Sequence, residues 1–195
     1  MISPLQGIFM SHLVRMQRPH LVLELGCYIG YSALWIAHAL RAQQDPSCHI
    51  WSCERDHQAA KIAKTNIATA GYANSVTLLA QSADDVLLHW DPEKKLDMIF
   101  IDANKSAYKR YYDIILNRDL LTNNGQIIVD NVLFHGRVHS LHSSPSSSVK
   151  TNTSIKNPIS AKLHDFNAHV AADNRTTQTL LPLFDGLLLI QKINR

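Results

Sequence analysis

Apolar residues follow two alternating patterns along this chain. Short continuous apolar runs that end at Gly or at an acidic residue are typical of buried strands. Longer stretches with apolar residues three or four positions apart are typical of helices. The first run, Leu21-Val22-Leu23-Glu24-Leu25, stops at Gly26, and residues 31–41 follow it with helical spacing. The pattern therefore predicts a strand followed by a helix as the repeating unit.

This alternation continues through most of the sequence. Strands are predicted at 21–25, 49–53, 76–80, 96–101 and 126–129, and helices at 31–41, 57–70, 84–89, 107–116 and 159–172. Two last strands are predicted at 178–183 and 187–192, because Asp185-Gly186 between them is a hairpin turn signal. The pattern predicts an α/β, Rossmann-like fold: a seven-stranded, mostly parallel sheet with helices on both faces and a C-terminal antiparallel hairpin strand.

Residues 134–158 interrupt the alternation. This segment is rich in Ser, Asn, Thr and His and has almost no apolar periodicity, which predicts a long flexible loop or lid. The spacing of His135, His139 and His142 would suit one helical face, but Gly136 and the neighbouring serines favour a loop over a zinc site. A length of 195 residues suits a single domain that covers residues 1–195.

Composition and charge indicate the cellular compartment more clearly than they indicate the function. Apolar residues make up 46%, no apolar run could span a bilayer, and MISPLQGIFM does not resemble a secretion signal, so we expect a cytoplasmic protein with no membrane partner. The net charge of +3 neither requires nor excludes a polyanionic partner. The three cysteines are odd in number and form no CxxC, which favours buried reduced thiols.

Acidic residues stand at four of the first five predicted strand ends, where ligands of open parallel sheets bind. Gly26 and Gly30 allow close backbone approach after the first strand, but the sequence is not GxGxxG. Glu24 at this turn disfavours a phosphate and suits a ligand with an ammonium group, such as S-adenosylmethionine (SAM). Glu54 at the second strand end can accept hydrogen bonds from ribose hydroxyls. The alternative is an ordinary strand–turn–helix with a solvated Glu.

A second group of polar residues follows the fourth and fifth strands. Asp102, Asp130 and Asn131 stand at the ends of adjacent strands, so their oxygens can converge on a hard divalent cation such as Mg²⁺. Lys105 comes three residues after Asp102, and a lysine beside a cation-bound hydroxyl can act as a general base. The alternative, in which Asp130-Asn131 is only a turn and Lys105 only a surface charge, stays open on spacing alone.

Several ordered stretches resemble the cation-dependent O-methyltransferases of the catechol and caffeoyl-CoA type. They are SPLQG (3–7), VLELGCYIGYSALWIA (22–37), the acid in WSCERD (51–56), MIFIDANKSAYKRYYD (98–113), IIVDNVLFHGRV (127–138) and DFNAHVAADNRTTQTLLPLFDGLLLIQK (165–192). The resemblance covers nearly the whole chain. It implies a class I methyltransferase fold and the transfer of a methyl group from SAM to a hydroxyl of a small, catechol-like acceptor.

The resemblance also implies a role for each matching residue. The residues that would contact SAM are Glu24 (amino group), Gly26, Tyr28, Gly30 and Ser32 (methionine part and carboxylate), Glu54 (ribose), Ala83 (adenine, through its backbone) and Asp102 (SAM and metal). Asp102, Asp130 and Asn131 would hold Mg²⁺ or another divalent cation, and Lys105 would be the catalytic base. One departure is Asp102-Ala103-Asn104-Lys105, where the family commonly has Asp-Ala-Asp-Lys; the first Asp and the Lys are kept.

The acceptor and the partners are the least defined features. Relatives commonly carry helices before SPLQG that help cover the substrate and form a dimer, and this sequence starts close to SPLQG, so a homodimer stays open. Some relatives methylate a hydroxylated uridine of tRNA, and the basic residues Lys105, Lys109, Arg110, Arg137 and Lys150 permit that alternative, although such a scatter is usually a solvated face. The missing GxGxxG disfavours an NAD-dependent oxidoreductase, and the retained Lys105 disfavours a non-catalytic SAM-binding protein.

Overall fold

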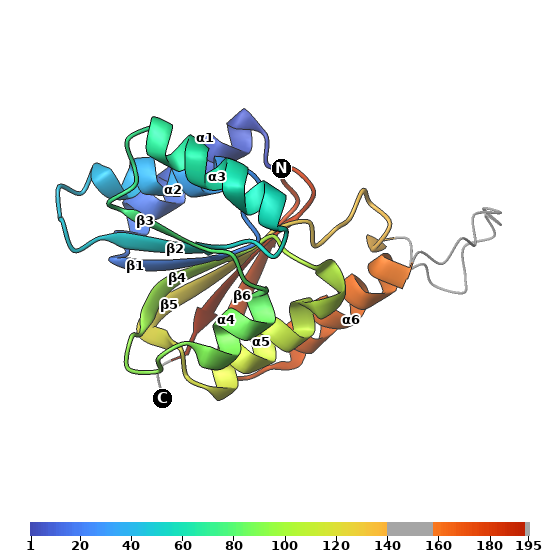
Figure 1. Cartoon of the computed structure of the whole chain (residues 1–195). Helices are drawn as coiled ribbons and strands as arrows, with labels where there is room; N and C mark the ends of the chain where they lie inside the picture. Colours follow the sequence, from blue (N-terminus) through green and yellow to red (C-terminus); the bar gives the residue numbers. More distant parts are fainter. Residues whose placement is uncertain (140–157, 194–195) are drawn as a thin grey trace, which may run out of the picture.

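A central sheet lies between two layers of helices in the computed structural model, which describes residues 1–139 and 158–193 (Figure 1). The strands are β1 (Leu21–Leu25), β2 (His49–Cys53), β3 (Val76–Leu79), β4 (Leu96–Ile101), β5 (Leu121–Val129), β6 (Thr176–Leu181) and β7 (Leu187–Lys192). The helices are α1 (Pro4–Gln17), α2 (Tyr31–Arg41), α3 (His57–Thr69), α4 (Ala83–His89), α5 (Tyr108–Asn117) and α6 (Pro158–Ala172), and the 3-10 turn η1 (Lys105–Ala107) precedes α5.

The sheet has the predicted mixed topology. Within the described ranges, seven strands run in the order β3-β2-β1-β4-β5-β7-β6. The first five are parallel to one another, and β7 is antiparallel to both β5 and β6. Chain order reverses between β1 and β4, and ligands of such sheets bind at the reversal point. The register pairs Leu25 with both Cys53 and Ile101, so the turns after β1, β2 and β4 meet at one edge.

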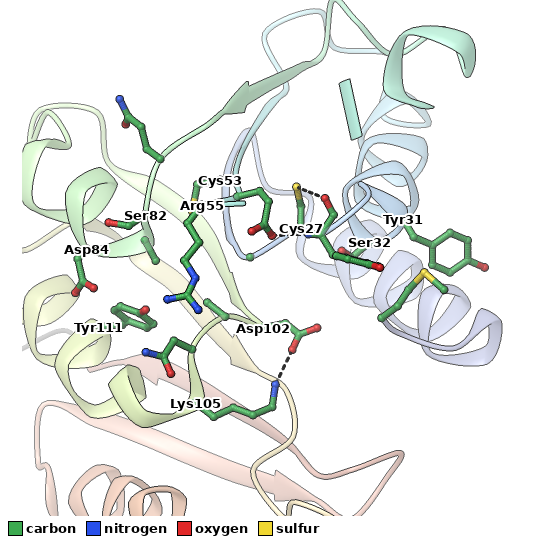
Figure 2. Close-up of a pocket in the computed structure, with 18 residues that line it drawn as sticks. Cys27, Tyr31, Ser32, Cys53, Arg55, Ser82, Asp84, Asp102, Lys105 and Tyr111 are labelled. Atoms are coloured by element: carbon green, nitrogen blue, oxygen red, sulfur yellow. Dashed lines mark hydrogen bonds and ion pairs between the residues drawn. The ribbon is translucent and has the colours of Figure 1, made fainter. Parts of the chain in front are cut away.

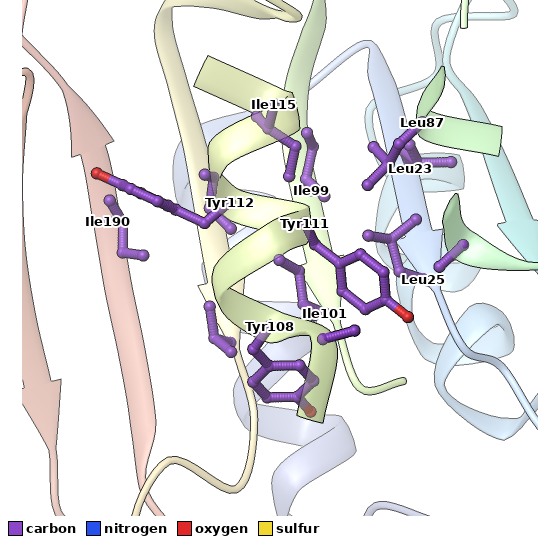
Figure 3. Close-up of a cluster of buried hydrophobic side chains, with 14 of the residues drawn as sticks. Leu23, Leu25, Leu87, Ile99, Ile101, Tyr108, Tyr111, Tyr112, Ile115 and Ile190 are labelled. Carbon is purple, nitrogen blue, oxygen red and sulfur yellow. The ribbon is translucent and has the colours of Figure 1, made fainter. Parts of the chain in front are cut away.

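Each face of the sheet has its own helices and its own core. Buried residues of α1, α2 and α3 pack on one face, and those of α4, α5 and α6 pack on the other. Figure 3 shows how α5 contributes to the second core, with Tyr108 and Tyr112 buried between the helix and the sheet. The Tyr112 hydroxyl shares a hydrogen bond of 3.0 Å with the Thr176 hydroxyl on β6. The cores therefore hold the strand ends rigidly from both sides.

The sequence pattern did not predict helix α1, and it predicted only the second half of β5. Ser3 caps α1 by accepting a hydrogen bond from the Gln6 backbone, and Pro4 opens the helix. Its apolar residues are spread around the helix, because Leu5, Ile8 and Met16 are exposed, so no clear apolar stripe marks it. Strand β5 begins five residues before the predicted 126–129, because exposed polar residues at 123 and 124 conceal its first half.

The observed bounds of β6 also differ from the predicted bounds. Strand β6 covers Thr176–Leu181 instead of 178–183, so five residues (182–186) join it to β7, where the predicted bounds left three. The antiparallel pairing predicted from Asp185-Gly186 is nevertheless confirmed.

Other expectations concern the segment after β5, the cysteines and membrane association. Phe134, His135 and Gly136 have left-handed backbones in a turn, whereas most of the predicted lid, with His142 and Lys150, lies outside the described residues. All three cysteines are free and buried, as predicted. Among residues 1–139 and 158–193, no helix has the length and apolar character needed to cross a membrane.

Candidate active site

A cleft of about 330 Å³ opens where the parallel strands end (Figure 2). Its walls come from the turn between β1 and α2 and from residues 53–55, 81–84 and 102–105, each of which follows a strand. The cleft thus lies at the reversal point of the sheet. Of the predicted SAM contacts, the cleft lining contains Gly26, Tyr28, Ser32, Glu54, Ala83 and Asp102.

The turn after β1 is shaped by glycine at two positions. Gly26 has a φ of +88°, and a Cβ there would clash with the backbone carbonyl of Asp102. Gly30 has a φ of +87° at the start of α2. The backbone amides of Gly26 and Cys27 both donate to the carbonyl of Cys53, at 3.0 and 3.2 Å. Only glycine permits the turn after β1 to lie this close to the backbone at the ends of β2 and β4.

Glu54 is held in place at the end of β2. Its two carboxylate oxygens accept hydrogen bonds of 2.9 Å, one from the backbone amide of Tyr28 and one from that of Asp56. Residue 54 is half-buried and forms part of the cleft wall. A carboxylate oriented in this way can still accept hydrogen bonds from a pair of ligand hydroxyls, since each oxygen has two acceptor positions.

Glu24, on β1 two residues before Gly26, is not part of the cleft lining. Its side chain is fully buried, the Ser52 hydroxyl donates to Oε2, and no described residue donates to Oε1. Burial raises the pKa of Glu24 from 4.5 to about 7. The buried carboxyl is therefore a polar group with unused hydrogen-bonding capacity.

Asp102 and Lys105 form an ion pair at the edge of the cleft (Figure 2). Lys105 Nζ lies 3.2 Å from Asp102 Oδ1, and both side chains are mostly buried. Burial raises the pKa of Asp102, and the Lys105 charge partly opposes this effect. Asn104 caps the intervening 3-10 turn by accepting a hydrogen bond from the Ser106 amide, which keeps Lys105 close to Asp102.

Asp130 and Asn131 lie next to this pair, at the end of β5. Asp130 is only 2% exposed, and it accepts hydrogen bonds from Gln6 Nε2 at 2.8 Å and from the Asn131 amide at 2.7 Å. Burial, followed by the charge of Asp102, raises the pKa of Asp130 from 3.8 to about 6. Two buried carboxylates that repel each other would be stabilised by a cation, so the residues present fit a divalent metal ion.

The ligand set that these residues offer is mixed. Among the described residues, no three His, Cys, Asp or Glu side chains are grouped as a metal site, so the candidate set consists of two carboxylates and the Asn131 amide. Gln6 was missed as the partner of Asp130, because SPLQG was not predicted to form the helix that brings it to β5.

Further cleft residues were also missing from the sequence-based set. Arg55, Asp84 and Tyr111 line the cleft at the end formed by residues 81–84. Tyr111 lines the cleft and also packs in the core on the α5 side of the sheet. Of the basic residues considered for RNA contact, Lys105 is paired with Asp102 and Arg110 with Asp84.

Comparison with known proteins agrees with this geometry. A family model described as O-methyltransferase matches residues 1–193. The chain belongs to the O-methyltransferase family. It is 31% identical over 196 residues to the catechol O-methyltransferase of Niastella koreensis, covering 96% of this chain and 80% of that protein. It is 30% identical over 192 residues to the probable caffeoyl-CoA O-methyltransferase 2 of Dictyostelium discoideum, covering 97% of this chain and 76% of that protein.

Solved structures of similar proteins share the same fold. An SAH-bound methyltransferase of Podospora anserina superposes with a TM-score of 0.86 at 31% identity, covering 100% of this chain and 80% of that one. An O-methyltransferase of Bacillus cereus in complex with SAH gives 0.83 at 27% identity, covering 98% and 82%. The predicted family, fold class and enzyme class, a SAM-dependent O-methyltransferase, are confirmed.

Proposed function

We propose that this O-methyltransferase methylates a hydroxyl of a small, catechol-like acceptor with the help of a divalent cation held by Asp102, Asp130 and Asn131. The observation that carries the proposal is the position of Asp102. Its carboxylate lines the cleft, pairs with Lys105 and raises the pKa of Asp130 by its charge. One residue thus joins the donor cleft, the candidate base and the candidate cation ligands.

The cleft suits SAM as the methyl donor. Gly26 and Ser32 both line the cleft, and the absence of a side chain at Gly26 allows the turn to lie directly against the backbone of Asp102. We assign Gly26, Tyr28, Gly30 and Ser32 to the methionine part, and Asp102 and the buried Glu24 to its ammonium group. Glu54 is assigned to the ribose hydroxyls, and Ala83, at the start of α4, to the adenine.

Lys105 would handle the proton of the acceptor hydroxyl. A divalent cation bound at the acidic pair would lower the pKa of that hydroxyl. Lys105 would first release its own proton to solvent and, as the neutral amine, accept the proton of the acceptor hydroxyl, while Asp102 holds the Lys105 side chain in place. The acceptor oxygen then forms a bond to the donor methyl carbon while the carbon–sulfur bond breaks, leaving neutral S-adenosylhomocysteine. Holding the two reactants at near-attack distance supplies much of the rate.

A methyl-transfer assay with and without metal tests the cation. Purified protein is incubated with labelled SAM and a panel of catechols, flavonoids, caffeoyl esters and tRNA. We expect transfer to a catechol-like acceptor that EDTA abolishes and that Mg²⁺ or Mn²⁺ restores. Full activity in EDTA would refute the proposed role of the cation. Transfer to tRNA alone, weakening with added salt, would replace the small acceptor by a nucleic acid.

Single substitutions distinguish a loss of activity at the site from a loss of the folded structure. Asp102→Ala should lose activity by about 10²-fold or more, as expected when one member of a catalytic constellation is removed. Asp165→Ala is the matched control, because residue 165 is an exposed acid on α6. Both variants should keep the far-UV CD spectrum of the wild type. Equal activity of the two variants would exclude Asp102 from the site.

A further inference from the structure

Asp185 makes contacts that go beyond the turn predicted from Asp185-Gly186. Its Oδ2 accepts a hydrogen bond of 3.3 Å from Asn131 Nδ2, and its Oδ1 accepts another from the His135 amide. Its own backbone carbonyl accepts from the Leu133 amide at 3.0 Å. The carboxylate is therefore tied to the segment that directly follows β5, which begins with a candidate cation ligand.

The backbone at this point brings residue 185 next to Asn131. Gly186 has a φ of +85°, and a Cβ there would lie 2.8 Å from the Leu133 backbone nitrogen. The Val132 amide donates to the Gly186 carbonyl at 3.1 Å. Together with the hydrogen bond from the Leu133 amide to the Asp185 carbonyl, it joins the segment after β5 to the segment before β7. Asn131 itself has a φ of +62°. Two left-handed backbone positions thus hold the two side chains face to face across 54 residues of sequence.

The chemistry of this contact selects one orientation of the Asn131 amide. An amide offers an oxygen that accepts and a nitrogen that donates, whereas an ionised carboxylate can only accept. Asp185 therefore engages the nitrogen and leaves the amide oxygen free for another partner. A cation binds the oxygen and not the nitrogen. A neutral residue at 185 that can both donate and accept would not make this selection.

The charge of Asp185 also reaches the centre of the site. Tyr108 is fully buried, and no described residue is hydrogen-bonded to its hydroxyl. Burial and then the charges of Asp102, Asp130 and Asp185 raise the pKa of Tyr108. The charges of all three carboxylates are therefore felt at one buried hydroxyl. No three acidic side chains in the described ranges are grouped closely enough for a metal site, so Asp185 stays outside the candidate ligand set.

We propose that Asp185 is a positioning residue that orients the Asn131 amide oxygen toward the cation and so sets the cation affinity without binding the cation. The inference rests on the proposed function of Asp102, Asp130 and Asn131. Groups that orient metal ligands typically contribute about 10- to 100-fold to metal affinity. We expect a loss of this size when Asp185 is removed, with donor binding retained, because Asp185 is not part of the cleft lining.

The experiment is Mn²⁺ titration monitored by the EPR signal of the free ion, in the absence of acceptor. The variants are Asp185→Ala, Asp185→Asn, Asn131→Asp and the double variant Asn131→Asp/Asp185→Asn, with Asp165→Asn as the matched surface control. The double variant exchanges the donor and acceptor of the contact and keeps the total charge and side-chain size. SAM affinity by calorimetry and thermal unfolding show that each variant is folded.

We expect Asp185→Ala to raise the Mn²⁺ dissociation constant by at least about 10-fold. The double variant should bind Mn²⁺ more tightly than the product of the two single effects allows, because the contact is restored in reverse. If Asp185→Ala does not fold, the double-variant cycle alone carries the test. Wild-type Mn²⁺ affinity in Asp185→Ala, or additive effects in the cycle, would overturn this inference alone. Absence of Mn²⁺ binding by the wild type would overturn the proposed cation site together with this inference.

Discussion

The buried Glu24 should make the stability of the protein depend on pH in a defined direction. The perturbation that tests this is Glu24→Gln, which keeps the shape of the side chain and removes its ionisation. Glu24 is fully buried, with one hydrogen bond from Ser52 and one oxygen without a partner among the described residues. An amide at this position can still accept from Ser52, so the substitution changes little in acid, where the carboxyl is protonated.

The magnitude follows from the pKa of the folded state. Burial raises the pKa of Glu24 from 4.5 to about 7, so the unfolded chain releases its proton at lower pH than the folded protein. The stability linked to this proton is fully present below pH 4.5 and is lost as pH rises through about 7. At about 1.4 kcal/mol per pKa unit, the full effect is about 3.5 kcal/mol, of which about 2.5 kcal/mol falls between pH 5 and pH 8.

Urea unfolding of both proteins at pH 5, 6, 7 and 8 measures this effect. The free energy of unfolding of the wild type should fall by about 2 to 3 kcal/mol more than that of Glu24→Gln over this range. The variant should therefore be the more stable protein by about 3.5 kcal/mol at pH 8 and by only about 1 kcal/mol at pH 5. Differences between the two proteins cancel the contributions of all other titrating groups.

Parallel pH profiles would refute the reasoning. They would mean that Glu24 ionises with an ordinary pKa in the folded protein, which requires water or a cationic partner beside its free oxygen. A variant that is less stable by the same amount at every pH would also contradict the raised pKa, because a constant loss reflects packing and not ionisation.

Three further predictions concern single side chains. Gly26→Ala should lower the unfolding free energy by more than about 2 kcal/mol and abolish activity, because a left-handed backbone and a clash with a carbonyl are imposed together; wild-type urea stability would contradict this. Lys105→Arg keeps a positive charge but cannot act as a base, so kcat should fall by about 10²- to 10⁴-fold, and an active variant would exclude the proposed role. Thr176→Val should cost about 1 kcal/mol, because the buried hydrogen bond between Tyr112 and Thr176 is lost while Asp173 still interacts with the Tyr112 hydroxyl; the exposed Thr177→Val on the same strand is the control, and an equal loss in both would contradict the argument.

Local patterning explains which elements were predictable. Strand β4 and helix α2 have the predicted bounds, because a continuous apolar run and an apolar stripe each reflect the burial of that element alone. Helix α1 was missed because part of its apolar surface is exposed, so its periodicity does not report its burial. The acids at the strand ends could be predicted as a group, since the ends of parallel strands share one edge of the sheet.

The neighbours of each site residue were decided by the tertiary structure. The sequence by itself determined the α/β fold, the family and the residues at the strand ends. Only the folded chain brought Gln6 to Asp130 across 124 residues and Asp185 to Asn131 across 54 residues. It also buried Glu24 fully and left it out of the cleft wall. Periodicity records how one element meets the core, whereas these contacts depend on how separate elements are packed against each other around the sheet.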